Sequence, residues 1–150
     1  MTPYVSAGAG FLLAVVWFDL MFDVQVLSHS ERNLPEGVLA SVAGYYGRVT
    51  TSARPMNRLI AGVMLATVAA IIAQITRGEH PVWAAWASVA LAAAPILLAG
   101  LRTVPSAVRL GGRADSLERQ SELARSIFRE HLVCFVAIAA LLTIQLSVLA

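Results

Sequence analysis

Two aspartates within an apolar stretch are the residues of this sequence best suited to chemistry. Asp19 and Asp23 interrupt the apolar run 7–27, and their spacing of four residues places both side chains on one face of a helix. An acidic group deep in a membrane span costs on the order of 3 kcal/mol on insertion scales, and such residues usually mark a functional site. We expect a functional role for the deeper Asp19. For Asp23, a structural ion pair with Arg58 or Arg102 is an equal alternative.

Other polar side chains are expected at the same depth, where the remaining apolar stretches begin or end. They are Asn57, Arg58, Arg102, Arg129, Glu130 and His131. His131 follows Ile127 by four residues and Phe128 by three, so it should point into a helix bundle. The pattern predicts a polar pocket at one end of the bundle. Its catalytic candidates are Asp19, Asp23 and His131, and its binding candidates are Asn57, Arg58, Arg102 and Arg129.

Acid–base chemistry is what this set of residues suits best. In such a pocket the arginines would keep the carboxylates ionised while His131 or Asp19 handles protons. A metal site from Asp19, Asp23 and His131 is chemically allowed and would favour iron, manganese or zinc, but no spacing motif supports it. We predict no metal site, and the sequence identifies no cofactor.

Cys134 is the only cysteine, so an intramolecular disulfide is excluded. The chain has no CxxC motif, which excludes the small four-span membrane oxidoreductases that exchange disulfides. We expect Cys134, three residues after His131, to act as a small apolar filler.

The composition places these residues in an integral membrane protein. Hydrophobic residues make up 58% of the 150 residues and charged residues 13%, whereas soluble domains have roughly 45–50% and about 25%. The mean hydropathy of +0.73 also argues against a soluble enzyme, a disordered tail or a nucleic-acid-binding module. Four stretches are long enough to cross a bilayer as helices, namely 7–27, 59–75, 82–101 and 132–149. We predict one all-α domain, a four-transmembrane-helix bundle.

The first stretch is interpreted as a retained span. It has no basic segment before it, carries two aspartates and is longer than the apolar core of a typical signal peptide.

The arginines predict the orientation of the bundle. Ten of the eleven lie in the segments 28–55 and 102–130 or at Arg58, and only Arg77 lies elsewhere. The positive-inside rule therefore puts both long loops in the cytoplasm and both termini on the non-cytoplasmic side of the cell membrane. Trp83 and Trp86 fit the aromatic belt at the outer interface. The net charge of +2 is thus explained by the membrane topology. We expect the lipid bilayer as the partner of the chain and no binding of nucleic acid.

The long loops are predicted to be structured. In 28–55, Asn33 is expected to cap a helix with Pro35 near its first turn. The apolar face of that helix would lie on the membrane surface, and its residues are Leu39, Val42, Tyr46 and Val49.

In the other long loop, 102–130, Gly111 and Gly112 should break the chain. Asp115 and Glu118 then resemble a capping box that starts one long helix over about 116–149, whose first half would extend into the cytoplasm.

Small residues recur every four positions in the two central spans. The two series are Gly62, Ala66 and Ala70, and Ala84, Ser88 and Ala92. Such faces let membrane helices approach closely, either within the bundle or in a homo-oligomer. Pro95 should kink the third span because it removes a backbone donor.

The layout resembles the anthrone-oxygenase-like group of small four-span membrane proteins. The likeness rests on the aromatic pair Tyr45 and Tyr46, the tight hairpin between spans two and three, the segment from Arg102 to Pro105, and the final helix with its Arg125 to His131 segment. It implies an oxygenase and carries over only His131. The acidic first span departs from that group.

Three functions are consistent with the sequence. The first is a membrane protein that binds or transforms a small hydrophobic molecule at the polar pocket. The second is a small transporter or channel subunit with Asp19 as the coupling site; small multidrug exporters also have four spans and an acidic residue in the first, but they are shorter and use a Glu motif absent here. The third is an accessory subunit of a larger membrane complex.

Overall fold

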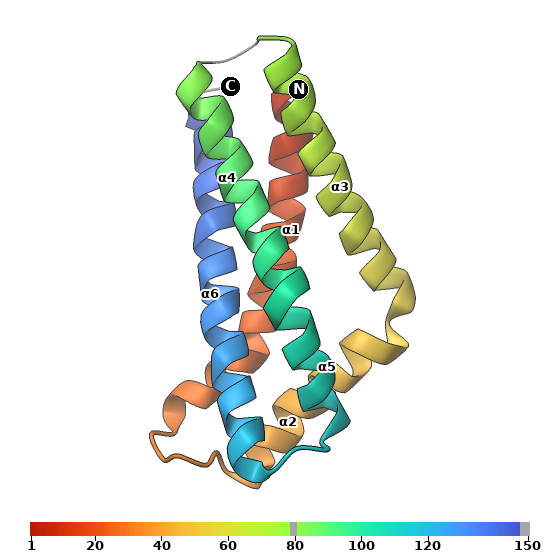
Figure 1. The fold of residues 1–150 in the computed structure, drawn as a ribbon, viewed down its shortest axis with the longest axis vertical. Coiled ribbons are helices and arrows are strands. Elements are labelled where there is room, and N and C mark those ends of the chain that lie inside the picture. Colours follow the sequence, from red (N-terminus) through yellow and green to blue (C-terminus); the bar gives the residue numbers. More distant parts are fainter. Residues whose placement is uncertain (79–80, 148–150) are drawn as a thin grey trace.

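The computed structural model describes residues 1–78 and 81–147, and this part of the chain folds into helices without a strand. The helices are α1 (Thr2–Asp23), α2 (Glu36–Gly47), α3 (Arg54–Thr76), α4 (Val82–Leu98), α5 (Val104–Gly112) and α6 (Leu117–Ser147). Three short turns join or extend them, η1 (Val24–Ser28), η2 (Arg48–Ser52) and η3 (Ala99–Thr103). Figure 1 shows α1, α3, α4 and α6 as long rods, with α2 and α5 at the end opposite the two termini. We call this end the loop end.

Four helical segments are long and apolar enough to cross a membrane. They are Thr2–Ser28, Pro55–Thr76, Val82–Gly112 and Leu117–Ser147. The predicted all-α four-helix architecture is therefore confirmed. The predicted spans 7–27, 59–75 and 82–101 fall inside these segments, and so does 132–149 as far as Ser147. Positions 148–149 of the last span and 79–80 of the predicted hairpin lie outside the described residues.

The third span continues beyond the predicted boundary at 101. Pro95 lies inside α4, and the π-helical turn η3 follows it and leads directly into α5. Proline lacks the N–H that donates the backbone hydrogen bond of an α-helix. A single π-helical turn is a common irregularity within a helix, and here it follows the proline. Pro105 is tolerated because it occupies the first turn of α5, where no partner for an N–H is required.

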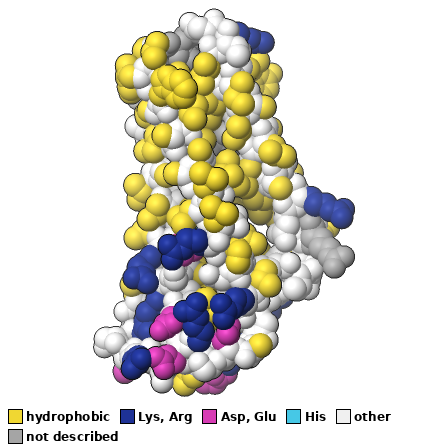
Figure 2. All heavy atoms as spheres, in the orientation of Figure 1, with side chains coloured by type: hydrophobic (Ala, Val, Ile, Leu, Met, Phe, Trp, Pro, Cys, Tyr) yellow, Lys and Arg dark blue, Asp and Glu magenta, His cyan; other side chains and the backbone are white. Residues whose placement is uncertain are grey.

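The polar and apolar surfaces of the molecule are separated along its long axis. Figure 2 shows hydrophobic side chains over the long rods, and charged side chains gathered mainly at the loop end. Large apolar side chains are exposed on every long helix, among them Phe18, Leu65, Trp86 and Val136. An exposed apolar band of this kind is the surface expected for helices that contact lipid.

The helix α2 packs against protein, so its predicted place on the membrane surface is wrong. Leu39, Val42 and Tyr46 are at most 3% exposed and form one apolar core with residues of α5 and α6. The predicted cap is also wrong, because Pro35 is the N-cap and no side chain caps this helix. The loop before it is instead held by Ser121, whose hydroxyl oxygen accepts the Leu34 N–H at 2.9 Å.

The start of α6 also differs from the predicted capping box. Ser116 is the residue whose hydroxyl oxygen accepts a backbone N–H of the first turn, that of Arg119, at 3.3 Å. Asp115 and Glu118 form ion pairs instead, with Arg109 and Arg32. The predicted break at Gly111 and Gly112 is confirmed, because α5 ends there and Arg113 turns the chain with a φ of +52°.

The two small-residue faces have different surroundings. Ala84, Ser88 and Ala92 of α4 are buried, as predicted for a packing face. On α3, Ala70 is buried, but Gly62 and Ala66 are exposed. The reason is visible in Figure 1, where α3 runs close to the bundle near the termini and diverges from it toward the loop end.

Buried amides join the helices near the termini. The Gln74 amide donates to Gln145 Oε1 at 2.9 Å, and the Gln145 amide donates to Ser88 Oγ at 3.1 Å. The Gln74 amide also lies 3.3 Å from Thr2 Oγ1, so the network connects α1, α3, α4 and α6. Interhelical hydrogen bonds of this kind contribute about 0.6 kcal/mol each in membranes. Sequence inspection did not single out Gln145.

A close crossing of backbones positions α2, and it gives the first testable prediction. A Cβ on Gly111 would meet backbone atoms of Gly47 at 2.7 Å and 2.9 Å, whereas a Cβ on Gly112 meets nothing within 4 Å. Gly111→Ala should therefore push α2 away from α5 and lower the free energy of unfolding by about 1–3 kcal/mol. Gly112→Ala is the matched control and should change it by less than about 0.5 kcal/mol. Equal unfolding midpoints for the two variants in a detergent titration would contradict the crossing.

Candidate functional site

A buried hydrogen bond between α1 and α6 forms the centre of the candidate site. His131 Nδ1 lies 2.6 Å from Asp23 Oδ2, and the Asp23 side chain has no exposed surface. The Tyr46 hydroxyl of α2 donates to the other carboxylate oxygen, Asp23 Oδ1, at 2.7 Å. Both oxygens of Asp23 are therefore occupied, and the three helices that meet at the loop end each supply one of the groups.

Asp19 lies on the opposite edge of the same imidazole. Its Oδ2 is 3.8 Å from His131 Nε2, and its Oδ1 accepts a hydrogen bond from the Tyr45 hydroxyl at 2.6 Å. The Asp19 side chain is 15% exposed, unlike that of Asp23. The separation of 3.8 Å is longer than a direct hydrogen bond, so Nε2 and Asp19 can share a hydroxyl group or a water placed between them.

The two tyrosines act as fixed donors. Burial raises the pKa of Tyr45 above its usual value, and the negative charge of Asp19 raises it further. Burial and the charge of Asp23 raise the pKa of Tyr46 in the same direction. Both phenols therefore remain protonated at neutral pH, and each hydroxyl donates a hydrogen bond to one of the aspartates.

This arrangement favours a basic Nε2 on His131. A carboxylate on Nδ1 holds the proton there, fixes the ring orientation and stabilises the imidazolium that forms when Nε2 takes up a second proton. The carboxylates meet opposite ring nitrogens and do not converge on one point. Consistently, no group of three or more His, Cys, Asp or Glu side chains in the described part of the chain is placed to hold a metal ion.

Glu130, beside His131, belongs to a separate network. The Thr103 hydroxyl donates to its Oε2 at 2.8 Å, and the Ser126 hydroxyl donates to its Oε1 at 2.8 Å. Arg102 Nε lies 3.6 Å from the same carboxylate, with its own side chain 68% exposed. Arg102 therefore pairs with Glu130, and the predicted pair with Asp23 does not form.

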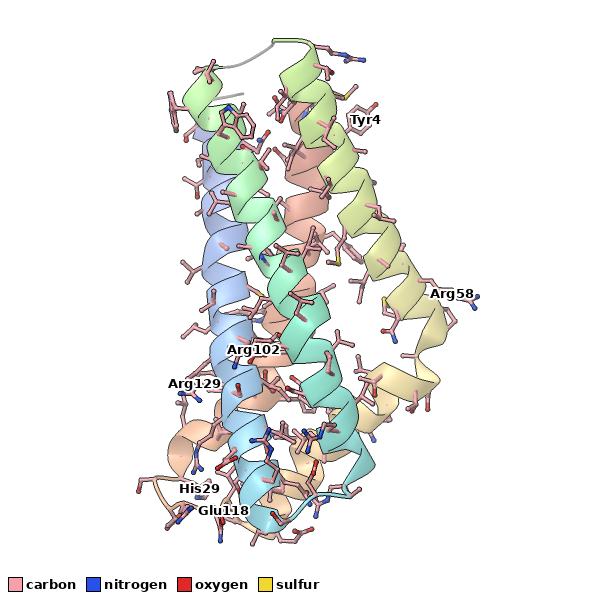
Figure 3. All side chains as sticks on the ribbon, in the orientation of Figure 1. Tyr4, His29, Arg58, Arg102, Glu118 and Arg129 are labelled. Carbon is pink, nitrogen blue, oxygen red and sulfur yellow. The ribbon has the colours of Figure 1, made fainter. Side chains whose placement is uncertain are left out.

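The structure brings together the three predicted catalytic candidates and separates them from most of the predicted binding residues. Arg58 and Arg129 are exposed, and Figure 3 shows both at the periphery of the bundle. The Asn57 amide donates to the Val49 carbonyl at 2.7 Å and so closes the turn before α3. Cys134 is buried, with its thiol 4.0 Å from the Pro95 carbonyl oxygen.

Sequence inspection missed the roles of Tyr45 and Tyr46. It treated the first as an aromatic loop residue and the second as part of an apolar face. The sequence did contain a signal for these roles. Two adjacent residues of a helix point about 100° apart, so one apolar face of α2 could not bury both tyrosines.

The comparisons with known proteins give no relative from which to transfer a function. No family model, no curated protein and no solved structure matches the chain.

The different burial of the two aspartates predicts different effects on stability. Asp23→Asn removes the charge that faces His131 inside the bundle, and breaking such a buried pair should cost about 3–5 kcal/mol. Asp19→Asn should cost about 1 kcal/mol, because its carboxylate is partly exposed and keeps an oxygen for Tyr45. Detergent unfolding titrations measure both. A larger loss for Asp19→Asn than for Asp23→Asn would contradict the geometry.

The raised pKa of Tyr46 predicts a loss of stability in alkali. The ordinary value is 10.0, so above about pH 10 the unfolded chain releases a proton that the folded chain retains. The contribution of Tyr46 to stability is therefore complete below pH 10 and is lost as pH rises beyond it. Melting temperatures between pH 8 and about pH 11 should fall less steeply for Tyr46→Phe than for the unmodified protein. Identical slopes would show that Tyr46 ionises in the folded state.

Proposed function

We propose that this chain is a membrane protein that binds a small hydrophobic molecule at the loop end and exchanges a proton with it through His131. The observation that supports this most strongly is the position of one imidazole between two carboxylates, with Nδ1 bonded to Asp23 and Nε2 open toward Asp19. A histidine with only a structural role would need one partner, whereas this one has an anchored nitrogen and a second nitrogen at a partly exposed carboxylate.

The proposed step is a proton transfer from an O–H or activated C–H group of the bound molecule to His131 Nε2. The substrate becomes its conjugate base, and the imidazole becomes an imidazolium that Asp23 and Asp19 stabilise. Tyr45 and Tyr46 hold the carboxylates in place during the transfer. The likeness to the anthrone-oxygenase-like group supports an enzyme in which this deprotonation activates the substrate.

The membrane orientation is part of the proposal. The chain would span the cell membrane with the loop end in the cytoplasm, because that end carries ten of the eleven arginines. The proton-exchanging groups would then lie at the cytoplasmic edge of the hydrocarbon layer, where a lipid-soluble substrate and water are both within reach.

Reporter fusions test this orientation. A reporter that is active only outside the cytoplasm should work at the N-terminus and at the C-terminus, and should fail when inserted after Arg32 or Arg113. The opposite pattern would contradict the proposed topology.

Substitutions at the site test the proposed binding and proton exchange. The unmodified protein, purified in nanodiscs with its native lipids, should carry a small hydrophobic molecule that mass spectrometry of an organic extract detects. Asp19→Asn and His131→Gln should reduce its amount at least tenfold. Arg119→Gln removes an exposed ion pair with Glu122 about 18 Å along α6 from His131 and should leave the amount unchanged.

Unfolding midpoints of the same samples separate loss of binding from loss of fold. Identical extracts from the unmodified protein and a folded Asp19→Asn variant would contradict the proposal. A different result would favour a proton-coupled carrier over an enzyme. In that case a folded Asp19→Asn variant would still bind the molecule but would no longer transport it together with protons across vesicle membranes.

A further inference from the structure

A groove of about 680 Å³ runs between α1 and α3. Its lining includes Tyr4, Gly8 and Phe11 of α1 and Leu59, Ala66 and Ala73 of α3. The groove follows α3 from Leu59 to Ala73, about 21 Å of helix. Its volume lies in the range of about 300–1,000 Å³ that is typical of small-molecule sites, and its walls are almost entirely apolar.

The divergence of α3 creates this groove. The two helices lie close together at Gly8, where an added Cβ would clash with Thr67 Oγ1. Toward the loop end α3 moves away from the bundle (Figure 1), whereas near the termini it packs against α1 and α4 and its Gln74 is hydrogen-bonded to Gln145 of α6. Ala66, an exposed small residue in this diverging part of α3, lines the groove.

The groove leads toward Asp19. Asp19 follows Gly8, and Phe22 follows Phe11, by eleven residues, which is about three turns, so each pair lies on nearly the same side of α1. Asp19 is thus about 16 Å along α1 from Gly8, and Leu59 reaches about 12 Å along α3 from Thr67 in the same direction. On α1 the lining of the groove ends at Phe11, about 12 Å before Asp19, so a ligand that follows the groove would have to extend beyond it to reach the carboxylate.

The groups around Asp19, beyond the lining of the groove, determine which head group fits. The rings of Phe22 and Tyr45 stack with centroids 4.0 Å apart and an interplanar angle of 9°, which offers an aromatic surface. Asp19 already accepts one phenolic hydroxyl, that of Tyr45, and its second oxygen faces His131 Nε2. Two carboxylates within contact of one imidazole repel an anionic head group but accept a neutral O–H donor.

We propose that the groove between α1 and α3 binds a single-chain lipid with a phenolic head group, whose hydroxyl reaches Asp19 and His131. The alkyl chain occupies the apolar groove, and the aromatic ring lies beside Phe22 and Tyr45. The inference rests on the proposed function for the role of His131, but it adds the substrate class and the path by which the substrate arrives.

Binding of 4-dodecylphenol to the full chain in detergent micelles tests the proposal, with native mass spectrometry as the readout. Saturable binding of one molecule per chain is expected. Dodecylbenzene, which lacks the hydroxyl, and dodecanoate, which is anionic, should bind at least tenfold more weakly. Equal binding of all three would overturn the assignment of the head group.

Substitutions on α3 test the groove separately from the site. Ala66→Trp fills the groove and should weaken binding of 4-dodecylphenol at least tenfold. Ala61→Trp adds the same bulk at an exposed position that does not line the groove and should leave binding unchanged. Unfolding midpoints confirm that both variants fold.

The two proposals fail in different ways. Unchanged binding in Ala66→Trp, together with a tenfold loss in Asp19→Asn, would overturn the groove as the chain-binding site and leave proton exchange at Asp19 standing. Unchanged binding in both variants would overturn both.

Discussion

The hydrogen bond between Asp23 and His131 is the interaction on which the arrangement of the loop end depends. A carboxylate with no exposed surface is tolerated only when its oxygens are paired, because desolvating a charge costs several kcal/mol. One oxygen meets the imidazole of α6 and the other meets the Tyr46 phenol of α2. The pairing therefore requires α1, α2 and α6 to meet at one point. It explains why α2 folds back into the bundle and does not lie on a membrane surface.

The remaining structure supplies the conditions for that pairing. The crossing of Gly47 and Gly111 brings α2 against α5 at backbone distance, and this places both tyrosines over the end of α1. At the other end, the amides of Gln74 and Gln145 hold the helices together, so that α3 can diverge toward the loop end without leaving the bundle. The same divergence opens the groove beside α1. The pairing at the loop end and the groove thus involve different pairs of helices.

The sequence predicted the four candidate spans well, because the length and hydropathy of an apolar stretch depend only on local composition. It also predicted that Asp19, Asp23 and His131 would share one end of the bundle, since their positions along neighbouring spans determine their depth. It did not predict their partners. Arginine was expected beside the aspartates because Arg58 and Arg102 lie where two spans begin or end, but Arg58 points away on the diverging α3 and Arg102 pairs with Glu130. Both outcomes depend on helix rotation and tilt, which hydropathy does not encode.

The protonation state of His131 in the membrane tests the central claim most directly. The chain has three histidines, so replacing His29 and His80 by Asn leaves a single imidazole for ¹⁵N solid-state NMR in lipid bilayers. The account predicts a protonated Nδ1 in a strong hydrogen bond that Asp23→Asn abolishes. It also predicts an Nε2 signal that titrates and changes when a phenolic ligand is added. An unprotonated Nδ1, or an Nε2 signal unaffected by pH and by ligand, would contradict the account and leave His131 with a structural role only.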